Sequence, residues 1–216
     1  MITVSAFKSV PPFARGLVRD LRVRWALEEA GIPYRANLVG REDLGTATYR
    51  AQQPFGQVPA FEEDGFSMFE SGAIVLHIGA RSPALMPADD IGKARATTWV
   101  FAALNSIEPA IQQLVEIDLF NSEQEWAKAR RPEVEKRAKQ RLADLATALG
   151  DNDYLEGRFT VGDLMMTTVL RFPRHCDLVA SQPRLKAYQE RCEARPAFQR
   201  ALRGQMEAFE ASPAVN

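Results

Sequence analysis

In the N-terminal part of the chain, the spacing of apolar residues changes between the two-residue period of strands and the 3.6-residue period of helices. Residues 2–7 form a short alternating run rich in β-branched side chains, and residues 34–39 form a second short run, which predicts two strands. Between them, residues 17–30 carry apolar side chains at helical spacing, and Gly31 followed by Pro33 marks the expected helix end. Two strands joined by a helix should lie parallel, through a right-handed crossover.

Two short runs further along the chain, residues 59–63 and 66–69, flank an Asp-Gly dipeptide. This dipeptide is typical of a tight hairpin turn, so we expect the two runs to pair antiparallel. The polar segment before them, residues 42–52, predicts one irregular helix, and residues 70–79 predict another helix. The N-terminal part is therefore predicted to be a small α/β sheet with helices on its faces.

The rest of the chain shows only helical periods. Residues 82–90 contain prolines and small side chains typical of a linker between domains. A long helix is expected over residues 94–120, with a bend near Pro109. We predict one domain over residues 1–81 and an all-helical domain over residues 91–216.

Composition and charge narrow the class of partner. The chain has 216 residues, with 27 Lys+Arg against 28 Asp+Glu. This balance gives no reason to expect nucleic acid or an anionic membrane as a partner. No apolar run approaches the roughly 20 residues that span a bilayer, and the first residues lack the apolar core of a signal peptide. Cys176 and Cys192 have neither redox nor metal spacing, so we expect a cytoplasmic protein without a metal.

Val58-Pro59 stands at the start of the first hairpin strand, although proline cannot donate a hydrogen bond to a sheet. Pro59 is therefore expected at a sheet edge, at a bulge or after a cis peptide bond. In each case the N–H and C=O groups of Val58 stay available side by side. Such an edge can pair with an extended peptide as a further strand does.

Glu70-Ser71 stands where the second hairpin strand ends and a helix begins. The first N–H groups of a helix lack internal partners and, with the helix dipole, favour a carboxylate. The Ser71 hydroxyl adds a donor, and the Glu70 carboxylate suits an ammonium group. A zwitterion site beside the peptide-pairing Val58 fits a short peptide with a free α-amino acid end, such as glutathione. The alternative is that Glu70 and Ser71 only cap the helix.

Several stretches of the sequence resemble the cytosolic glutathione transferase family, and the resemblance covers nearly the whole chain. It is carried by RVRWALEEAGIPY (residues 22–34), QPFGQVPAF (53–61), FESGAIVLHI (69–78) and FTVGDLMMTTVL (159–170). The last stretch resembles the family's capping box, and the EARPAFQRAL stretch near the end resembles bacterial members. The resemblance implies a thioredoxin-like N-terminal domain followed by an all-helical domain.

The resemblance also implies how glutathione, as co-substrate, is held. Val58 pairs through its backbone with the cysteinyl part, and Pro59 follows a cis bond. Glu70 and Ser71 hold the γ-glutamyl end, and Gln57 contacts the tripeptide. The family is typically a homodimer, with the small electrophile bound between the two domains.

The loop before the first helix departs from the family pattern. Family members usually stabilise the glutathione thiolate with Tyr or Ser there, or carry Cys for thiol transfer, because the thiolate is the nucleophile. Here the text is SVPPFARG, without Tyr or Cys. Three candidates remain: backbone N–H groups around Gly16 and Leu17, the charge of Arg15 or Arg19, and the Ser9 hydroxyl. We favour the backbone together with Arg15.

Phe13, in the same loop, is expected to contribute to the electrophile pocket. The missing Cys argues against thiol-transfer chemistry through a mixed disulfide. The leading hypothesis is an enzyme of detoxification that conjugates the glutathione thiolate to a small electrophile, or reduces organic peroxides. The alternative is a non-catalytic protein of the same fold that binds glutathione or an apolar ligand. A glutathione-dependent isomerase is the third hypothesis, and the absence of the serine-cysteine loop of that branch argues against it.

Overall fold

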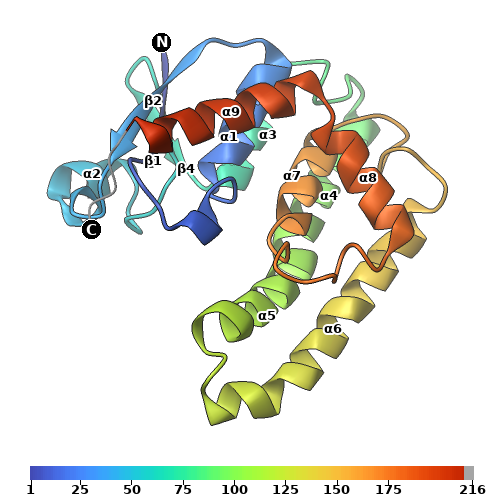
Figure 1. Ribbon diagram of the computed structural model, residues 1–216. Coiled ribbons are helices and arrows are strands. Elements are labelled where there is room, and N and C mark those ends of the chain that lie inside the picture. The colour runs from blue at the N-terminus through green and yellow to red at the C-terminus, as the bar shows by residue number, and fades with distance from the viewer. Residues whose placement is uncertain (212–216) are drawn as a thin grey trace. The chain divides into compact units, whose positions relative to one another are not determined.

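The computed structural model describes residues 1–211, which form two compact units (Figure 1). Unit 1 comprises residues 1–86 together with the C-terminal segment from Arg195, and unit 2 comprises Pro87–Ala194. The sequence had suggested one helical domain over residues 91–216. The last described helix instead packs within unit 1, and residues 212–216 lie outside the described residues.

Unit 1 is built on a mixed sheet whose strand order is β2-β1-β3-β4. β1 runs parallel to β2, while β3 is antiparallel to both β1 and β4. The parallel pair and the hairpin are as predicted, and the turn residues Asp64 and Gly65 have φ angles of 50° and 83°. The strands are β1 Ile2–Phe7, β2 Tyr34–Val39, β3 Ala60–Glu63 and β4 Phe66–Phe69.

The helices of unit 1 match the predicted order, with two differences in detail. The first α-helix begins at Asp20 rather than at residue 17, because residues 17–19 form a turn: the N–H groups of Leu21 and Arg22 bond to carbonyls three residues earlier instead of four. Residues 42–52 form a 3-10 turn and a separate short helix instead of one irregular helix. The elements are η1 Pro12–Ala14, α1 Asp20–Ala30, η2 Asp43–Gly45, α2 Ala47–Gln52, α3 Ser71–Gly79 and α9 Pro196–Glu210.

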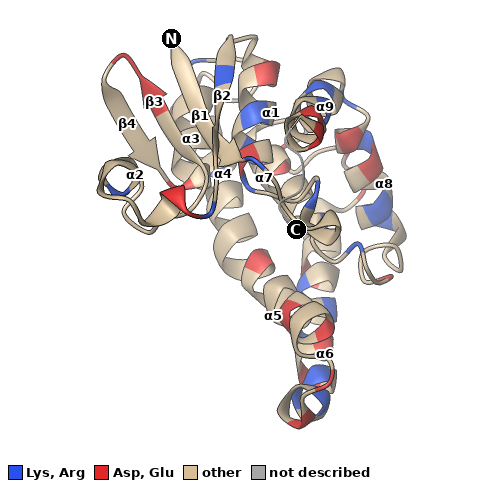
Figure 2. Ribbon diagram, turned by 60° about the vertical axis from the view of Figure 1, so that its left-hand side comes forward, with Lys and Arg blue, Asp and Glu red and all other residues tan. Residues whose placement is uncertain are grey.

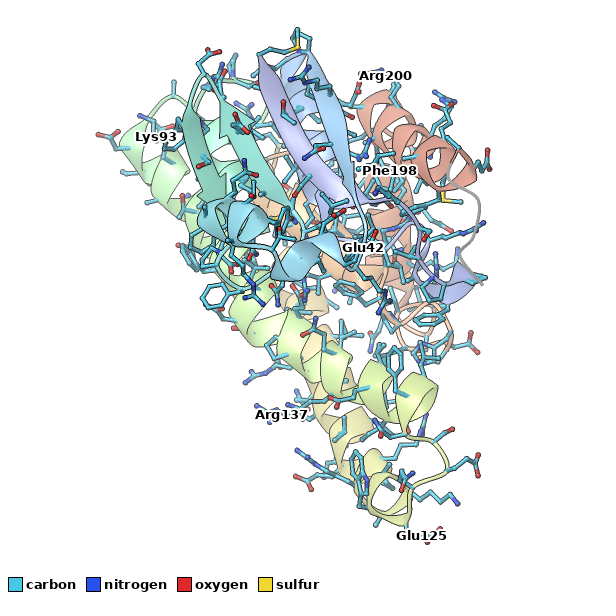
Figure 3. The ribbon with its side chains drawn as sticks, turned by 90° about the vertical axis from the view of Figure 1, so that its left-hand side faces the viewer. Glu42, Lys93, Glu125, Arg137, Phe198 and Arg200 are labelled. Atoms are coloured by element: carbon cyan, nitrogen blue, oxygen red, sulfur yellow. The ribbon has the colours of Figure 1, made fainter. Side chains whose placement is uncertain are left out.

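Helix α9 belongs to unit 1 because it packs along α1. Its Phe198 ring meets the buried Trp25 ring edge-on, with 4.8 Å between the ring centroids. The Arg200 guanidinium binds Glu28 at 2.7 Å, and Figure 3 marks both Phe198 and Arg200 on α9. Near the other end of α9, the fully buried Gln205 side chain donates to the Asp20 carboxylate at 2.6 Å. These contacts extend along α1. They join two segments far apart in the sequence, and hydrophobic periodicity alone cannot predict which helices pack together.

Unit 2 is helical, and its central helix α7 is buried along its entire length. The helix expected over residues 94–120 is divided by the π-helical turn η3, which ends directly before Glu108 and Pro109. Proline lacks the N–H that a continuous helix needs, so the interruption falls where the bend was expected. The elements are α4 Asp90–Ala102, η3 Ala103–Ile107, α5 Glu108–Phe120, α6 Glu125–Leu149, α7 Val161–Leu170 and α8 Pro183–Glu193.

Charged side chains of both signs are spread along α6, which has 25 residues (Figure 2). Its buried residues include Val134, Ala138, Leu142, Leu145 and Leu149, as the helical period predicts. Among the described residues, no helix combines the length and apolar character that crossing a membrane requires.

Candidate functional site

Glu70 lies at the N-cap of α3 with an unusual backbone. Its φ and ψ angles are 70° and 110°, and among residues 1–211 only Asp64 and Glu70 are non-glycine residues with positive φ. Such a conformation costs about 1–3 kcal/mol and points to a functional constraint. The exposed Glu70 side chain makes no capping hydrogen bond. The helix-cap alternative is therefore wrong for this carboxylate, which is left facing solvent.

Helix α3 begins with groups that suit an anion. Its first turn contains no acidic residue, and Ser71 is nearly buried, with 5% of its surface exposed. The buried Arg22 side chain donates from Nη1 to Ser71 Oγ at 3.2 Å. Because a guanidinium only donates, Ser71 keeps its own proton for another acceptor. Arg22 thus adds a positive charge behind the predicted carboxylate site.

Arg22 was not among the residues predicted for the site. Every residue of α1 from Asp20 to Leu27 is buried, so no amphipathic pattern distinguishes the position of Arg22 from its neighbours. Its partner Ser71 lies 49 positions further along the chain. Only the tertiary packing of α1 on α3 connects the two side chains.

The structure shows the peptide bond on which the predicted pairing edge depends. The Val58–Pro59 peptide bond is cis, as the family resemblance implied, and Pro59 directly precedes β3. The Val58 side chain packs in a buried cluster with Val39 and Tyr49. With its side chain facing inward, Val58 presents its backbone, while the neighbouring Gln57 is exposed.

Gly56 shapes the turn before this edge. Its φ angle is 61°, and a Cβ atom there would lie 2.8 Å from the carbonyl oxygen of Leu44. A larger residue would therefore face both backbone strain and a clash with η2. The positive φ and the close Leu44 carbonyl together explain why glycine occupies this position in the PFGQVP stretch.

The hairpin register brings the two halves of the candidate site to one end of the sheet. Ala60 pairs with Phe69 across the antiparallel β3–β4 ladder. Pro59 directly precedes Ala60, and Glu70 directly follows Phe69, so the cis bond and the N-terminus of α3 lie at the same end of the sheet. A single extended peptide can therefore reach both the backbone edge and the helix terminus.

Comparisons with known proteins identify the family. Residues 21–86 match the description "Glutathione S-transferase, N-terminal domain", and residues 110–203 match "Glutathione S-transferase, C-terminal domain". Glutathione S-transferase 3 of Zea mays is 31% identical, over 84% of this chain and 87% of the maize protein. The chain belongs to the glutathione S-transferase family. The predicted enzyme class, a transferase that uses glutathione, is thereby confirmed.

Solved structures agree with this assignment. A glutathione transferase from Burkholderia graminis, solved with two glutathione molecules bound per subunit, has a TM-score of 0.80 and 25% identity. The match covers 100% of this chain and 89% of the other. Glutathione S-transferase 4 of Zea mays is 28% identical over 82% of this chain and 83% of its own length. The predicted fold, a thioredoxin-like domain followed by a helical domain, is confirmed for the present chain.

The N–H group of Leu17, one of the expected thiolate donors, already has a hydrogen-bond partner. The backbone N–H groups of Leu17, Leu21 and Arg22 each donate to the carbonyl three residues earlier, at 3.0–3.1 Å. The α1 terminus also holds its own acid, the fully buried Asp20, whose carboxylate accepts from Arg24 Nε at 2.7 Å. Burial raises the pKa of Asp20, and Arg24 acts in the opposite direction. Leu17 is therefore removed from the list of thiolate donors.

The other loop candidates lie between β1 and α1 of the glutathione transferase. Gly16 is buried, Arg15 and Ser9 are half-buried, and Phe13 has 47% of its surface exposed. An exposed phenylalanine is available for contact with an apolar ligand. In the part of the chain that the structure describes, no group of three or more His, Cys, Asp and Glu side chains is arranged to hold a metal ion.

Proposed function

We propose that the protein conjugates the glutathione thiolate to a small electrophile, with the tripeptide held at the end of the β3–β4 hairpin. Val58 pairs through its N–H and C=O with the cysteinyl part, and Gln57 contacts the peptide beside it. The α3 terminus and Ser71 bind the γ-glutamyl carboxylate, and Glu70 binds the ammonium group. The same thiolate would serve for the reduction of organic peroxides, the other reaction proposed for this site.

The observation that carries the proposal is the conformation of Glu70. Its left-handed backbone, exposed carboxylate and missing capping bond leave it without an evident structural purpose. The cost of the strained backbone is explained if the carboxylate binds a ligand. The solvent-facing Glu70 carboxylate, next to an anion site, is suited to bind the ammonium group of a ligand.

The loop residues Ser9, Arg15 and Gly16 are the proposed stabilisers of the thiolate, and Phe13 is the proposed contact for the electrophile. A nearby cation or hydrogen-bond donor lowers the pKa of a thiol, which is about 8.5 when free. We also propose a cytoplasmic homodimer with a role in detoxification. The two cysteines, neither of which forms a disulfide, suit a reducing compartment.

The first test is an ultraviolet titration of the thiolate in the protein–glutathione complex, run together with turnover of a chloronitrobenzene substrate. We expect a depressed thiol pKa and measurable conjugation. The alternative is a glutathione-binding protein without catalysis. It would be favoured if glutathione binds with an unshifted thiol pKa and the protein turns over neither the chloronitrobenzene substrate nor organic peroxides.

Replacing Arg15 with alanine is expected to raise the pKa of the bound glutathione thiol by about 1, because a close positive charge favours the thiolate. The same ultraviolet titration measures the shift. Arg41→Ala, which removes an exposed arginine of unit 1 outside the loop, is the matched control. If the titration is unchanged in Arg15→Ala but the thiol pKa rises in Ser9→Ala, the Ser9 hydroxyl and not Arg15 stabilises the thiolate.

A further inference from the structure

A buried hydrogen-bonded series connects the β1 strand and α2 to both sides of Val58. The backbone N–H of Ala60 donates to Ser5 Oγ at 2.6 Å, and Ser5 Oγ lies 2.8 Å from the Tyr49 hydroxyl. The Tyr49 hydroxyl donates to the carbonyl of Gln57 at 2.7 Å. Ser5, Tyr49 and Ala60 are each at most 5% exposed, so the series is shielded from water.

The direction of every bond in the series is fixed by its two ends. A backbone N–H only donates and a carbonyl only accepts, while each hydroxyl carries one proton. Tyr49 uses its proton on Gln57, so Ser5 must donate to Tyr49, and Ser5 must accept from Ala60. Burial raises the pKa of the Tyr49 hydroxyl, against the effect of the bond to Ser5, so the proton is retained at neutral pH. The series admits a single arrangement of protons.

This arrangement orients the peptide groups that flank Val58. In a trans peptide unit, the C=O of one residue and the N–H of the next point in opposite directions. Because Tyr49 holds the Gln57 carbonyl, the Val58 N–H points away from Tyr49. Because Ser5 holds the Ala60 N–H, the Pro59 carbonyl points away from Ser5. Val58 is therefore fixed on both sides, and its buried side chain prevents it from turning.

We propose that Ser5 and Tyr49 are positioning residues for glutathione, which orient the Val58 backbone edge without touching the ligand. The proposal rests on the proposed function, since it assigns a task to residues behind the same site. Holding a recognition edge in its bound orientation lowers the cost of ordering it when the ligand binds. Affinity for glutathione should then depend on a hydroxyl that the ligand never contacts.

Replacing Tyr49 with phenylalanine removes the hydroxyl and keeps the ring in its apolar cluster. We expect the dissociation constant and the KM for glutathione to rise about fivefold to tenfold, the effect of one or two lost hydrogen bonds. The kcat at saturating glutathione should change little, because the thiolate stabilisers are elsewhere. Calorimetry and steady-state kinetics measure the two quantities.

Tyr188→Phe is the matched control, because Tyr188 is a buried tyrosine of unit 2 whose hydroxyl also donates one hydrogen bond, to Asp163 at 3.0 Å. It should lower the thermal midpoint and leave glutathione affinity unchanged. If both variants lose affinity equally, or if Tyr49→Phe binds as wild type does, the positioning role is overturned. If Tyr49→Phe does not fold, Ser5→Ala breaks the series at its other hydroxyl and must show the same rise in KM. Wild-type protein that binds no glutathione would instead contradict the proposed function.

Discussion

Replacing Glu70 with glycine is expected to weaken glutathione binding about tenfold to a hundredfold without lowering the stability of the fold. A hydrogen bond to a charged group contributes about 1.5–3 kcal/mol, which sets the loss in affinity. Glycine adopts the backbone of Glu70, whose φ is 70°, without strain. Calorimetry with glutathione measures the first effect, and thermal unfolding measures the second.

Asp64→Gly provides a closely matched control for Glu70→Gly. Asp64 is also exposed, acidic and left-handed, with a φ of 50°, but it lies in the turn at the opposite end of the hairpin. Its substitution removes the same charge and the same kind of backbone strain. It should leave glutathione affinity unchanged. Equal losses in both variants would mean that net charge, and not a contact at Glu70, governs binding.

A second ligand tests which group Glu70 recognises. A glutathione analogue without the α-amino group of its γ-glutamyl residue cannot offer an ammonium to the carboxylate. Wild-type protein should bind this analogue as weakly as Glu70→Gly binds glutathione, and Glu70→Gly should bind both ligands equally. A further loss when both changes are combined would show that the ammonium group is recognised elsewhere.

The elements of unit 1 could be predicted from local patterns because their signals are local. Strand alternation gave the bounds of β1 and β2, and the Asp-Gly dipeptide gave the hairpin. The late start of α1 could not be predicted, since Leu17 continues the apolar period of the helix although residues 17–19 form a turn. The packing of α9 on α1 also escaped prediction. It rests on pairs such as Asp20 and Gln205, which are 185 positions apart.

The residues of the candidate site also fall into those with a local sequence signal and those without one. Val58, Pro59, Glu70 and Ser71 could be proposed from the sequence because proline and a strand-to-helix junction have local structural consequences. The positive φ of Glu70 carries no sequence signal, since only glycine announces such a conformation reliably. Arg22 and Tyr49 act through partners distant in the sequence. One signal was available for Tyr49: it is a lone aromatic residue in a polar segment.

Replacing Asp163 with alanine is expected to destabilise the protein by about 3–5 kcal/mol, the range of a broken buried polar network. The predicted capping box at the start of α7 is confirmed, with Thr160 at the N-cap. The fully buried Asp163 carboxylate also accepts from the Leu155 N–H at 2.9 Å and from the Tyr188 hydroxyl at 3.0 Å. Its removal leaves these buried donors unpaired, and each costs about 1–3 kcal/mol. The thermal midpoint should fall by roughly 10 °C.

The control for Asp163 is Asp144→Ala on α6, where the carboxylate accepts from Gln140 at 2.9 Å but is exposed. That loss should stay within about 0.5 kcal/mol, because water replaces the partner. Tyr188→Phe alone should cost about 1 kcal/mol, and in the Asp163→Ala background it should recover part of the loss, since it removes a buried hydroxyl that has no acceptor. Independent, additive losses would mean that the carboxylate and the hydroxyl do not act together.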